Sequence, residues 1–302
     1  GSILSRSGAV TTIILDPRTN GSGISGTTKG ILPTNQAGTV THNYVDLGSL
    51  LLGIQNQIRE LLENFNVKFD DIMFISISAP GPLNSKTGLI LDTPNLKVMK
   101  NVNICKILNE KFNLPVYLEN DANLFALGEW YLNYKKHNVM VGITLGTGLG
   151  LGVIINEKLF NGAHGMGAEY GISMYNGKMW EDVISIEGLE KLTIKKMNEK
   201  KSPKILYNLA LDGNSEALKI WNIFGKELGI FSSHIVNMID PSIICFGGGV
   251  SKAYTFFSNS LKKELVKYSP SFSHNKILLK SSSNQLNSTH VGAALHGLKQ
   301  NL

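Results

Sequence analysis

The sequence predicts an α/β protein of two lobes with a ligand cleft between them. Strand-like runs of β-branched and apolar residues alternate with segments of helical period, which is typical of the α/β class. A pattern of hairpin, strand and helix occurs near the start and again in the second half, and it indicates two related halves. Glycine-rich segments follow two buried-type strands, at the strand ends where α/β folds place ligands.

The first half begins with a hairpin and a long helix. Residues 9–16 (AVTTIILD) predict a strand, residues 18–23 (RTNGSG) a turn, and residues 26–34 a returning strand. A helix is expected over residues 44–65, because apolar residues recur there at helical spacing. We expect the following residues of this stripe to pack in the core: Leu47, Leu50, Leu51, Ile54, Ile58, Leu61 and Leu62.

The later elements alternate between strand and helix. In chain order, the sequence first predicts a strand over 71–83 broken at Pro80-Gly81-Pro82, a helix over 104–112, a strand over 115–118 and a helix over 122–132. It then predicts two strands joined by a glycine-rich turn over 138–160 and a mainly helical stretch over 188–230. The last elements are a strand running into three glycines over 241–251, a strand over 276–282 and a helix over 289–298.

The lobe boundaries follow from this order. We expect a smaller lobe made of residues 1–117 and 290–302, and a larger lobe made of residues 118–289. The last helix would then return to the first lobe. A chain of 302 residues is long enough for either one large domain or two medium ones.

Composition and charge exclude several classes of protein. The net charge is +6, but the lysines are scattered and no basic stripe alternates with aromatic residues, so we expect no nucleic-acid partner in this chain. The two cysteines, Cys105 and Cys245, cannot build a disulfide framework or a metal knuckle, which favours a reducing, cytoplasmic setting. No apolar run reaches transmembrane length, so no membrane partner is expected.

The segment Glu119-Asn120-Asp121 stands where a predicted strand meets a predicted helix. Asp and Asn are preferred helix caps, because their side-chain oxygens accept hydrogen bonds from the first backbone N–H groups. A carboxylate at the end of a strand is also placed where α/β folds bind ligands. Both interpretations fit this stretch when it is taken alone.

Two glycine-rich segments are candidate ligand sites. Residues 145–152 (LGTGLGLG) form a turn between strands, and its glycines leave backbone N–H groups uncovered for an oxyanion. Residues 245–251 (CFGGGVS) end a buried strand, where a nucleotide base or ribose would lie against bare backbone. Either segment taken alone is also compatible with an ordinary tight turn.

The order and spacing of four segments resemble the ROK family of sugar kinases and repressors. These segments are ISAPGPLNSKTGLILDTPNL, ENDANLFALGEW, ITLGTGLGLGVIINEKLFNGAHGMGAEYG and IVNMIDPSIICFGGGVS, and they extend from about Ile75 to Ser251. The resemblance implies a two-lobed actin-like ATPase (ribonuclease H-like) fold. It also implies an ATP-dependent kinase for a hexose or an N-acetylhexosamine that uses ATP and Mg²⁺ and forms a homodimer.

The resemblance assigns roles to individual residues. Asp121 corresponds to the general base that takes the proton from the sugar hydroxyl. The other residues that match sugar-contacting positions are Gly81, Asn95, Asn120, Glu169 and Glu181. The residues that match the phosphate and adenosine positions are Gly8, Gly146, Thr147, Gly148, Gly247, Gly248 and Gly249.

The chain departs from the family pattern at two places. Many ROK proteins bind zinc through one His and three Cys, but here Ile172 replaces the His and residues 173–180 contain no Cys, so we expect no zinc and no other metal ligands. We expect Trp180 to fill part of that space. The family also begins with an Asp-x-Gly-Gly-Thr phosphate loop, and the aligned residues here are Ser5-Arg6-Ser7-Gly8-Ala9, which retain one glycine.

Two functions remain compatible with these observations. One is a sugar kinase with an altered first phosphate loop. The other is a non-catalytic sugar-binding protein, such as the sensor domain of a transcriptional regulator or a pseudokinase. The residue at position 121 and the complete turn at residues 145–150 favour the kinase, whereas the altered loop favours the sensor.

Overall fold

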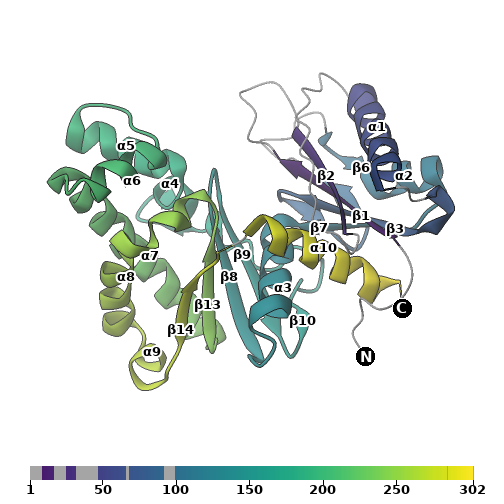
Figure 1. The fold of residues 1–302 in the computed structure, drawn as a ribbon. Coiled ribbons are helices and arrows are strands. Elements are labelled where there is room, and N and C mark those ends of the chain that lie inside the picture. The colour runs from purple at the N-terminus through teal and green to yellow at the C-terminus, as the bar shows by residue number, and fades with distance from the viewer. Residues whose placement is uncertain are drawn as a thin grey trace. The chain divides into compact units, whose positions relative to one another are not determined.

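The chain forms two compact units in a computed structural model that describes residues 9–16, 25–31, 47–65, 68–91, 99–283 and 285–301 (Figure 1). The first unit contains Gly1–Leu132, Asn161–Gly167 and Leu286–Leu302, and the second contains Asn133–Phe160 and Ala168–Gln285. The predicted lobe boundary after residue 117 precedes helix α3 (Asp121–Asn133), whereas the units divide near its end. Helix α3 groups with the first unit because it packs against that unit's last helix.

Among its described residues, the first unit is built on a four-stranded sheet. Its strands are β1 (Ala9–Asp16), β2 (Ser25–Ile31), β3 (Ile72–Ala79) and β7 (Val116–Asn120), in the order β2-β1-β3-β7. Strand β1 is antiparallel to β2 and parallel to β3, and β3 is parallel to β7. The carboxyl ends of three parallel strands therefore meet at one edge of this sheet.

The second unit repeats this arrangement. Its strands are β8 (Val139–Leu145), β9 (Leu149–Ile155), β10 (Lys158–Leu159), β13 (Ile243–Gly247) and β14 (Leu278–Ser281), in the order β10-β9-β8-β13-β14. Strand β8 is antiparallel to β9 and parallel to β13, which is parallel to β14. Each sheet thus joins one hairpin to a run of parallel strands, which confirms the repeated pattern expected from the sequence.

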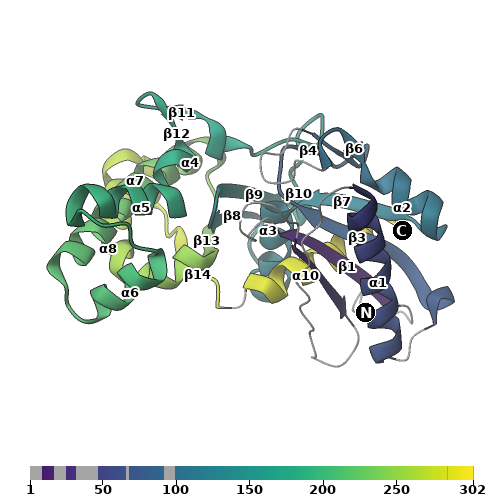
Figure 2. The same cartoon turned by 90° about the horizontal axis from the view of Figure 1, so that it is seen from above.

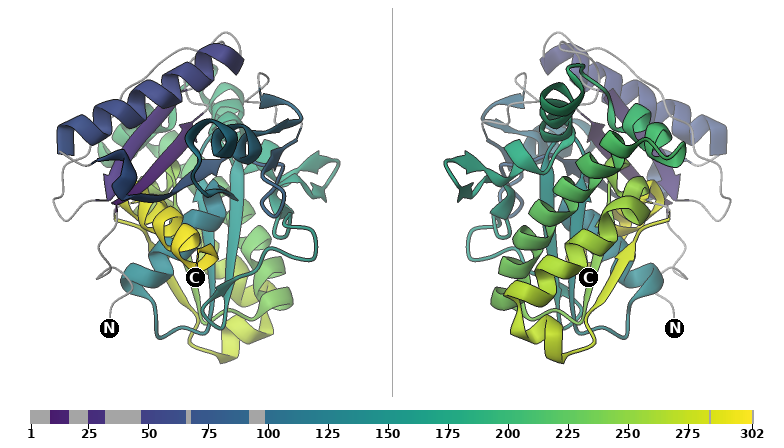
Figure 3. Two further views of the ribbon diagram at one scale, coloured as in Figure 1. Left: turned by 90° about the vertical axis from the view of Figure 1, so that its right-hand side faces the viewer. Right: turned by 90° about the vertical axis from the view of Figure 1, so that its left-hand side faces the viewer.

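Helices cover both faces of the first sheet (Figure 3). Helices α1 (Leu47–Phe65) and α2 (Ile104–Phe112) pack on one face, where Ile54 and Leu108 join Ile75 and Ile77 in the core. Phe74 points to the other face, where it packs with Ala294 and Leu298 of α10 (Gln285–Gln300). Phe74 and its neighbours Ile75 and Ile77 pack on opposite faces, so this one strand supports both layers.

Helices α3 and α10 approach each other closely through two glycines. A Cβ atom on Gly128 would lie 1.7 Å from the carbonyl oxygen of Ser288, and one on Gly292 would lie 1.9 Å from that of Leu124. The buried carboxylate of Glu129 also accepts a 2.7 Å hydrogen bond from the Ser288 hydroxyl. This contact fixes α3, and with it the turn that precedes α3.

The helices of the second unit gather on one face of its sheet (Figure 2). They are α4 (Trp180–Val183), α5 (Ile186–Met197), α6 (Pro203–Leu211), α7 (Ser215–Ile239), α8 (Tyr254–Tyr268) and α9 (Pro270–His274). Helix α7 is the centre of this layer, and Trp221, Phe224 and Phe231 on it are fully buried.

Short elements complete both units. The first unit contains the 3-10 helix η2 (Phe69–Asp71) and the small strands β4 (Leu83–Asn84), β5 (Leu89–Ile90) and β6 (Val102–Asn103). The second unit contains η4 (Tyr170–Ile172), η5 (Gly249–Ala253), and the hairpin strands β11 (Met174–Tyr175) and β12 (Lys178–Met179).

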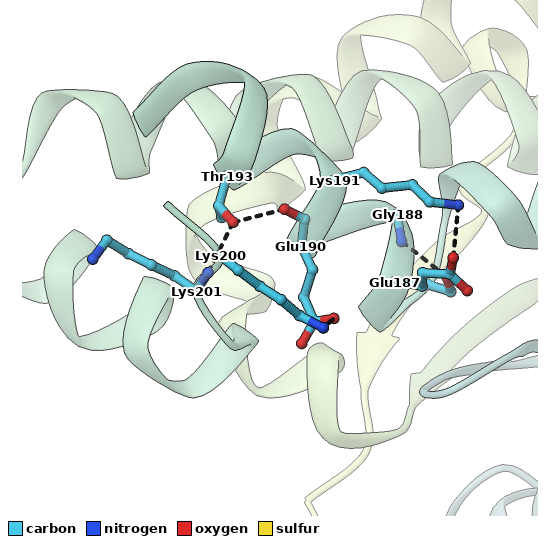
Figure 4. Close-up of polar contacts among 8 residues, drawn as sticks. Glu187, Gly188, Glu190, Lys191, Thr193, Lys200 and Lys201 are labelled. Atoms are coloured by element: carbon cyan, nitrogen blue, oxygen red, sulfur yellow. Dashed lines mark hydrogen bonds and ion pairs between the residues drawn. The ribbon is translucent and has the colours of Figure 1, made fainter. Parts of the chain in front are cut away.

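Surface lysines pair with nearby acids. Figure 4 shows α5 and the segment after it, where Lys191 lies 2.8 Å from Glu187 and Lys200 lies 2.9 Å from Glu190. The amide of Lys201 also donates to the Thr193 hydroxyl at 3.0 Å. The two ion pairs are typical of a solvated surface, whereas Thr193 is buried. No helix within the described part of the chain is long and apolar enough to cross a membrane.

Candidate functional site

The turn between β7 and α3 presents Asn120 and Asp121 at the carboxyl end of β7. The side-chain oxygen of Asn120 accepts hydrogen bonds from the amides of Ala122, at 2.9 Å, and Asn123, at 3.4 Å. Oδ1 of Asp121 accepts from the amide of Ala122 at 2.8 Å. Asn120 therefore provides the capping contact to Asn123, while the half-buried Asp121 places a carboxylate at the helix N-terminus, where the helix dipole favours negative charge.

The side chain of Glu119 stabilises this turn through hydrogen bonds. Its side chain is fully buried, and Oε1 accepts from the amide of Asn120 at 2.8 Å and from Nδ2 of Asn123 at 2.9 Å. Oε2 accepts from Nδ2 of Asn161 at 2.6 Å. A buried carboxylate is tolerated only where donors replace water, and three donors do so here.

The turn at residues 146–148 joins β8 to β9. The amide of Gly146 donates to the carbonyl of Gly148 at 3.1 Å, and the carbonyl of Gly146 accepts from the amide of Ile186 at 2.9 Å. Thr147 is exposed. A Cβ atom added to Gly146 would meet no heavy atom within 4 Å. Packing within the unit therefore does not explain why residue 146 is a glycine.

The second glycine segment lies beside this turn. Gly247, at the end of β13, pairs with Thr144 of β8, and a Cβ atom on Gly248 would lie 2.0 Å from the carbonyl oxygen of Leu145. Gly248 also has a φ of +91°, so its glycine identity has a structural reason. Gly249 is exposed, and a Cβ atom there would meet nothing within 4 Å. We call Gly146 and Gly249 the open glycines.

Glu181 closes one side of the 146–148 turn. It lies on α4, its carboxylate is hydrogen-bonded to the backbone of Leu149, and a Cβ atom on Gly148 would lie 3.3 Å from its Oε2. Burial raises the pKa of Glu181 above its ordinary value, and the neighbouring Asp182 adds to this shift. The structure thus brings Glu181 to the predicted phosphate turn, although the family pattern assigns this residue to the sugar.

Glu169 precedes η4 and lines a small pocket in the second unit. The pocket has a volume of about 220 Å³. Its walls are mainly apolar and include Leu151, Val153, Phe160 and Met238. Ala168, just before Glu169, has a φ of +70°, which is uncommon for a residue with a side chain.

Five aromatic rings hold the elements that carry Glu169 and Glu181. The buried Trp180 stacks on Tyr175 with ring centroids 3.9 Å apart, and both rings meet the edge or face of His234 on α7. The Tyr170 hydroxyl lies at hydrogen-bond distance, 2.9 Å, from Nδ1 of His234, and Phe231 packs against Tyr170 and Trp180. Trp180 therefore occupies the interior of this segment.

No metal cluster is found among the described residues: no three His, Cys, Asp or Glu side chains gather there as a binding group. Of the predicted site residues, Gly8 and Asn95 lie outside the described residues. Gly81 follows β3 and is partly exposed.

The position of β1 bears on the predicted first phosphate loop, which included Ala9. Ala9 pairs with Ile72 at the amino end of β3, whereas Asn120 pairs with Ala79 at the carboxyl end. The length of β3 between these pairs is about 23 Å at the usual rise per strand residue. Ala9 is thus a strand residue at the edge opposite Asp121, because β1 runs parallel to β3, and it is not a loop residue beside Asp121.

Three residues of this network, Glu119, Asn123 and Asn161, were not predicted as site residues from the sequence. An acid that directly follows an apolar strand and directly precedes Asn-Asp was an available signal for Glu119. No local signal marked Asn161, because its partner lies 42 residues earlier in the chain.

Comparison with known proteins places these features in one family. The model of the ROK family matches residues 49–299. A glucokinase from Thermotoga maritima is 30% identical over 248 residues, covering 73% of this chain and 78% of that protein. An N-acetyl-D-glucosamine kinase from Haemophilus influenzae is 29% identical (70% and 76%), and a xylose repressor from Caldicellulosiruptor bescii is 30% identical (64% and 54%).

Solved structures agree on the fold. A ROK hexokinase from Thermus thermophilus superposes with a TM-score of 0.79 at 21% identity, covering 97% of this chain and 99% of that chain. A ROK family transcriptional regulator, a homologue of the E. coli MLC protein, superposes with a TM-score of 0.83 at 20% identity, covering 98% and 80%. The fold is therefore the two-lobed actin-like ATPase fold, as the sequence predicted.

Proposed function

The chain belongs to the ROK family, and from this premise we propose that it is an ATP-dependent kinase for a hexose or an N-acetylhexosamine. Asp121 is the general base in this proposal. It takes the proton from a sugar hydroxyl while that oxygen forms a bond to the γ-phosphorus of ATP, and the bond from this phosphorus to ADP breaks. Mg²⁺, when bound with ATP, neutralises the phosphate charge.

The two open glycines carry this proposal. They follow neighbouring parallel strands, and neither is explained by packing or by a positive φ. Bare backbone at the carboxyl ends of α/β strands suits close approach of a phosphate or a nucleoside. Gly146, Thr147 and Gly148 would therefore receive phosphate, while Gly247, Gly248 and Gly249 would flank the adenosine.

The sugar would be held by polar side chains. Oδ1 of Asn120 already serves the helix cap, so this residue would bind a hydroxyl through its NH₂ group. Glu169 would accept hydrogen bonds from further hydroxyls, with Gly81 and Asn95 as additional contacts. Glu181 lies against the phosphate turn, so we propose that it keeps the turn in place through the backbone of Leu149 as well as contacting the sugar.

A second candidate function is a non-catalytic sugar sensor. The similarity to xylose repressors and the superposition on a ROK transcriptional regulator favour it. The altered sequence at residues 5–9 also favours it, because only one glycine of the family's first phosphate loop is retained there. A sensor would bind a sugar through Asn120 and Asp121 without transferring phosphate.

The deciding experiment is incubation of the protein with Mg·ATP and a pool of hexoses and N-acetylhexosamines, read by mass spectrometry. The kinase proposal predicts a sugar phosphate that is absent when Asp121→Asn replaces the wild-type protein. Absence of any product, together with a sugar that raises the melting temperature, would overturn the kinase proposal and leave the sensor.

A further inference from the structure

Glu119 is a buried charge without an assigned role. It has no exposed surface, and within the described part of the chain three neutral amides donate to its carboxylate. The buried His296 also interacts with this carboxylate electrostatically. Two of these amides, from Asn120 and Asn123, belong to the turn that carries Asp121 and to α3. The third, from Asn161, belongs to a segment 42 residues later. One carboxylate therefore joins the β7–α3 turn to a distant loop.

That loop, Asn161–Gly167, belongs to the first unit, although the residues on both sides of it belong to the second. Lys86 Nζ donates to the carbonyl of Ala163 at 2.6 Å. A Cβ atom on Gly165 would lie 2.9 Å from the Ser85 hydroxyl oxygen, so the loop lies close to the segment after β3. The bond between Glu119 and Asn161 is the least exposed of these anchors, because Glu119 is fully buried and Asn161 is partly buried.

We propose that Glu119 and Asn161 are positioning residues for the sugar site. Their hydrogen bond docks the Asn161–Gly167 loop beside the turn that carries Asp121. In the sequence, the loop ends one residue before Ala168 and two before Glu169. The expected effect on the sugar KM rests on the proposed sugar kinase, whereas docking of the loop by this hydrogen bond does not depend on that proposal.

In the hydrogen bond between Asn161 and Glu119, Asn161 is the donor. Nδ2 of Asn161 faces Oε2 of Glu119, and Oδ1 of Asn161 is buried with no hydrogen-bond partner among the described residues. Glu119→Gln keeps an acceptor for Asn120 and Asn123, and its new NH₂ group can donate to Oδ1 once the Asn161 amide turns over. Asn161→Asp instead puts a carboxylate oxygen where Nδ2 now lies, 2.6 Å from Oε2 of the buried Glu119, so that two like charges repel strongly.

These differences define a four-protein cycle: wild type, Glu119→Gln, Asn161→Asp and the double variant. Asn161→Asp should raise the sugar KM at least tenfold while kcat falls less than threefold, because Asp121 keeps its contacts on α3. The double variant should return the sugar KM to within threefold of wild type, since the Gln NH₂ donates to the new carboxylate. Glu119→Gln alone should keep the sugar KM within threefold of the wild-type value.

Hydrogen–deuterium exchange of residues 161–167 gives a readout that does not need catalysis. Exchange should be faster by at least tenfold in Asn161→Asp and should return to the wild-type rate in the double variant. Lys86→Met is the matched control, because it removes an exposed anchor of the same loop, and it should change exchange less than threefold. Asn161→Ala, which leaves one oxygen of Glu119 without its donor, replaces Asn161→Asp if that variant does not fold.

The two readouts separate the two proposals. If wild type phosphorylates no sugar, the kinase proposal fails, and exchange still decides whether the bond docks the loop. If Asn161→Asp and Asn161→Ala both exchange like wild type, or if the double variant is no better than Asn161→Asp, the positioning role is wrong. Rescue of exchange without rescue of the sugar KM would show a bond that supports the fold alone and would also overturn the role.

Discussion

The two sheets share one topology but present opposite kinds of surface at their carboxyl edges. At the end of β7, Glu119, Asn120 and Asp121 form a dense network of side-chain hydrogen bonds. At the ends of β8 and β13, the chain presents bare backbone at Gly146 and Gly249. In the proposed function, these two edges divide the roles: the first unit supplies the proton acceptor, and the second supplies glycine backbone for phosphate.

The largest expected effect is at the first of these edges. Asp121→Asn keeps the shape of the side chain but removes the proton acceptor, so turnover should fall about 10³-fold while sugar affinity stays within about tenfold. Steady-state kinetics and calorimetric titration with sugar measure the two quantities. Asp70→Asn changes an exposed acid of the same unit and should match wild type. Wild-type turnover in Asp121→Asn would mean that another group is the base.

The second prediction contrasts two glycines of the second unit. A Cβ atom on Gly171 would lie 2.1 Å from the carbonyl oxygen of Leu149, so Gly171→Ala should lower the free energy of unfolding by about 1–3 kcal/mol. Gly146→Ala meets open space and should change it by less than about 0.5 kcal/mol. Urea denaturation of both variants measures the difference. Equal destabilisation would show that Gly146 is needed for the fold rather than for a ligand.

The third prediction concerns the aromatic rings beneath Glu169 and Glu181. Tyr170→Phe removes the hydroxyl that meets His234 and should lower the free energy of unfolding by about 1 kcal/mol. Tyr175→Phe is the matched control, because the stacking ring on Trp180 remains, and its effect should be smaller. Thermal denaturation compares the two. A larger loss of stability in Tyr175→Phe than in Tyr170→Phe would contradict this prediction, because the hydroxyl of Tyr175 would then make the stronger contact.

The smallest expected effect is a change of stability with pH that arises from Glu181. Because burial raises the pKa of Glu181 above its ordinary value of 4.5, the folded protein binds this proton more tightly than the unfolded chain does. Stability therefore falls as pH rises from that ordinary value through the raised pKa of the folded state. Glu181→Gln should raise the melting temperature more at pH 7 than at pH 4. Equal shifts at both values would contradict an unfavourable ionised carboxylate at this turn.

Local elements were predictable because their signals are local. Helix α2 spans Ile104–Phe112, as its apolar spacing indicates, and Asn103 caps it by accepting from the amide of Lys106 at 2.9 Å. Strand β1 also matches its β-branched run, Ala9–Asp16. Helix α10 begins at Gln285 and is longer than expected. Its start was not predicted, because the residues before the apolar run lack helical periodicity.

The connections within the candidate site were not predictable in the same way. The sequence indicated Asp121 and the glycine segments, since each is a short motif at the end of a strand. It did not indicate that Gly146 and Gly249 are open while Gly248 is needed for packing, because that distinction depends on what surrounds each residue in space. The bond between Glu119 and Asn161 likewise appears only when the chain is folded.

The most direct test of this division of roles is calorimetric titration of a non-hydrolysable ATP analogue with Mg²⁺ into protein saturated with a bound hexose. We expect wild type to bind the analogue and Gly146→Ala to bind it at least tenfold more weakly, with sugar affinity unchanged. Binding of sugar without any binding of the analogue to wild type would contradict the kinase proposal and assign the protein to the sugar sensors.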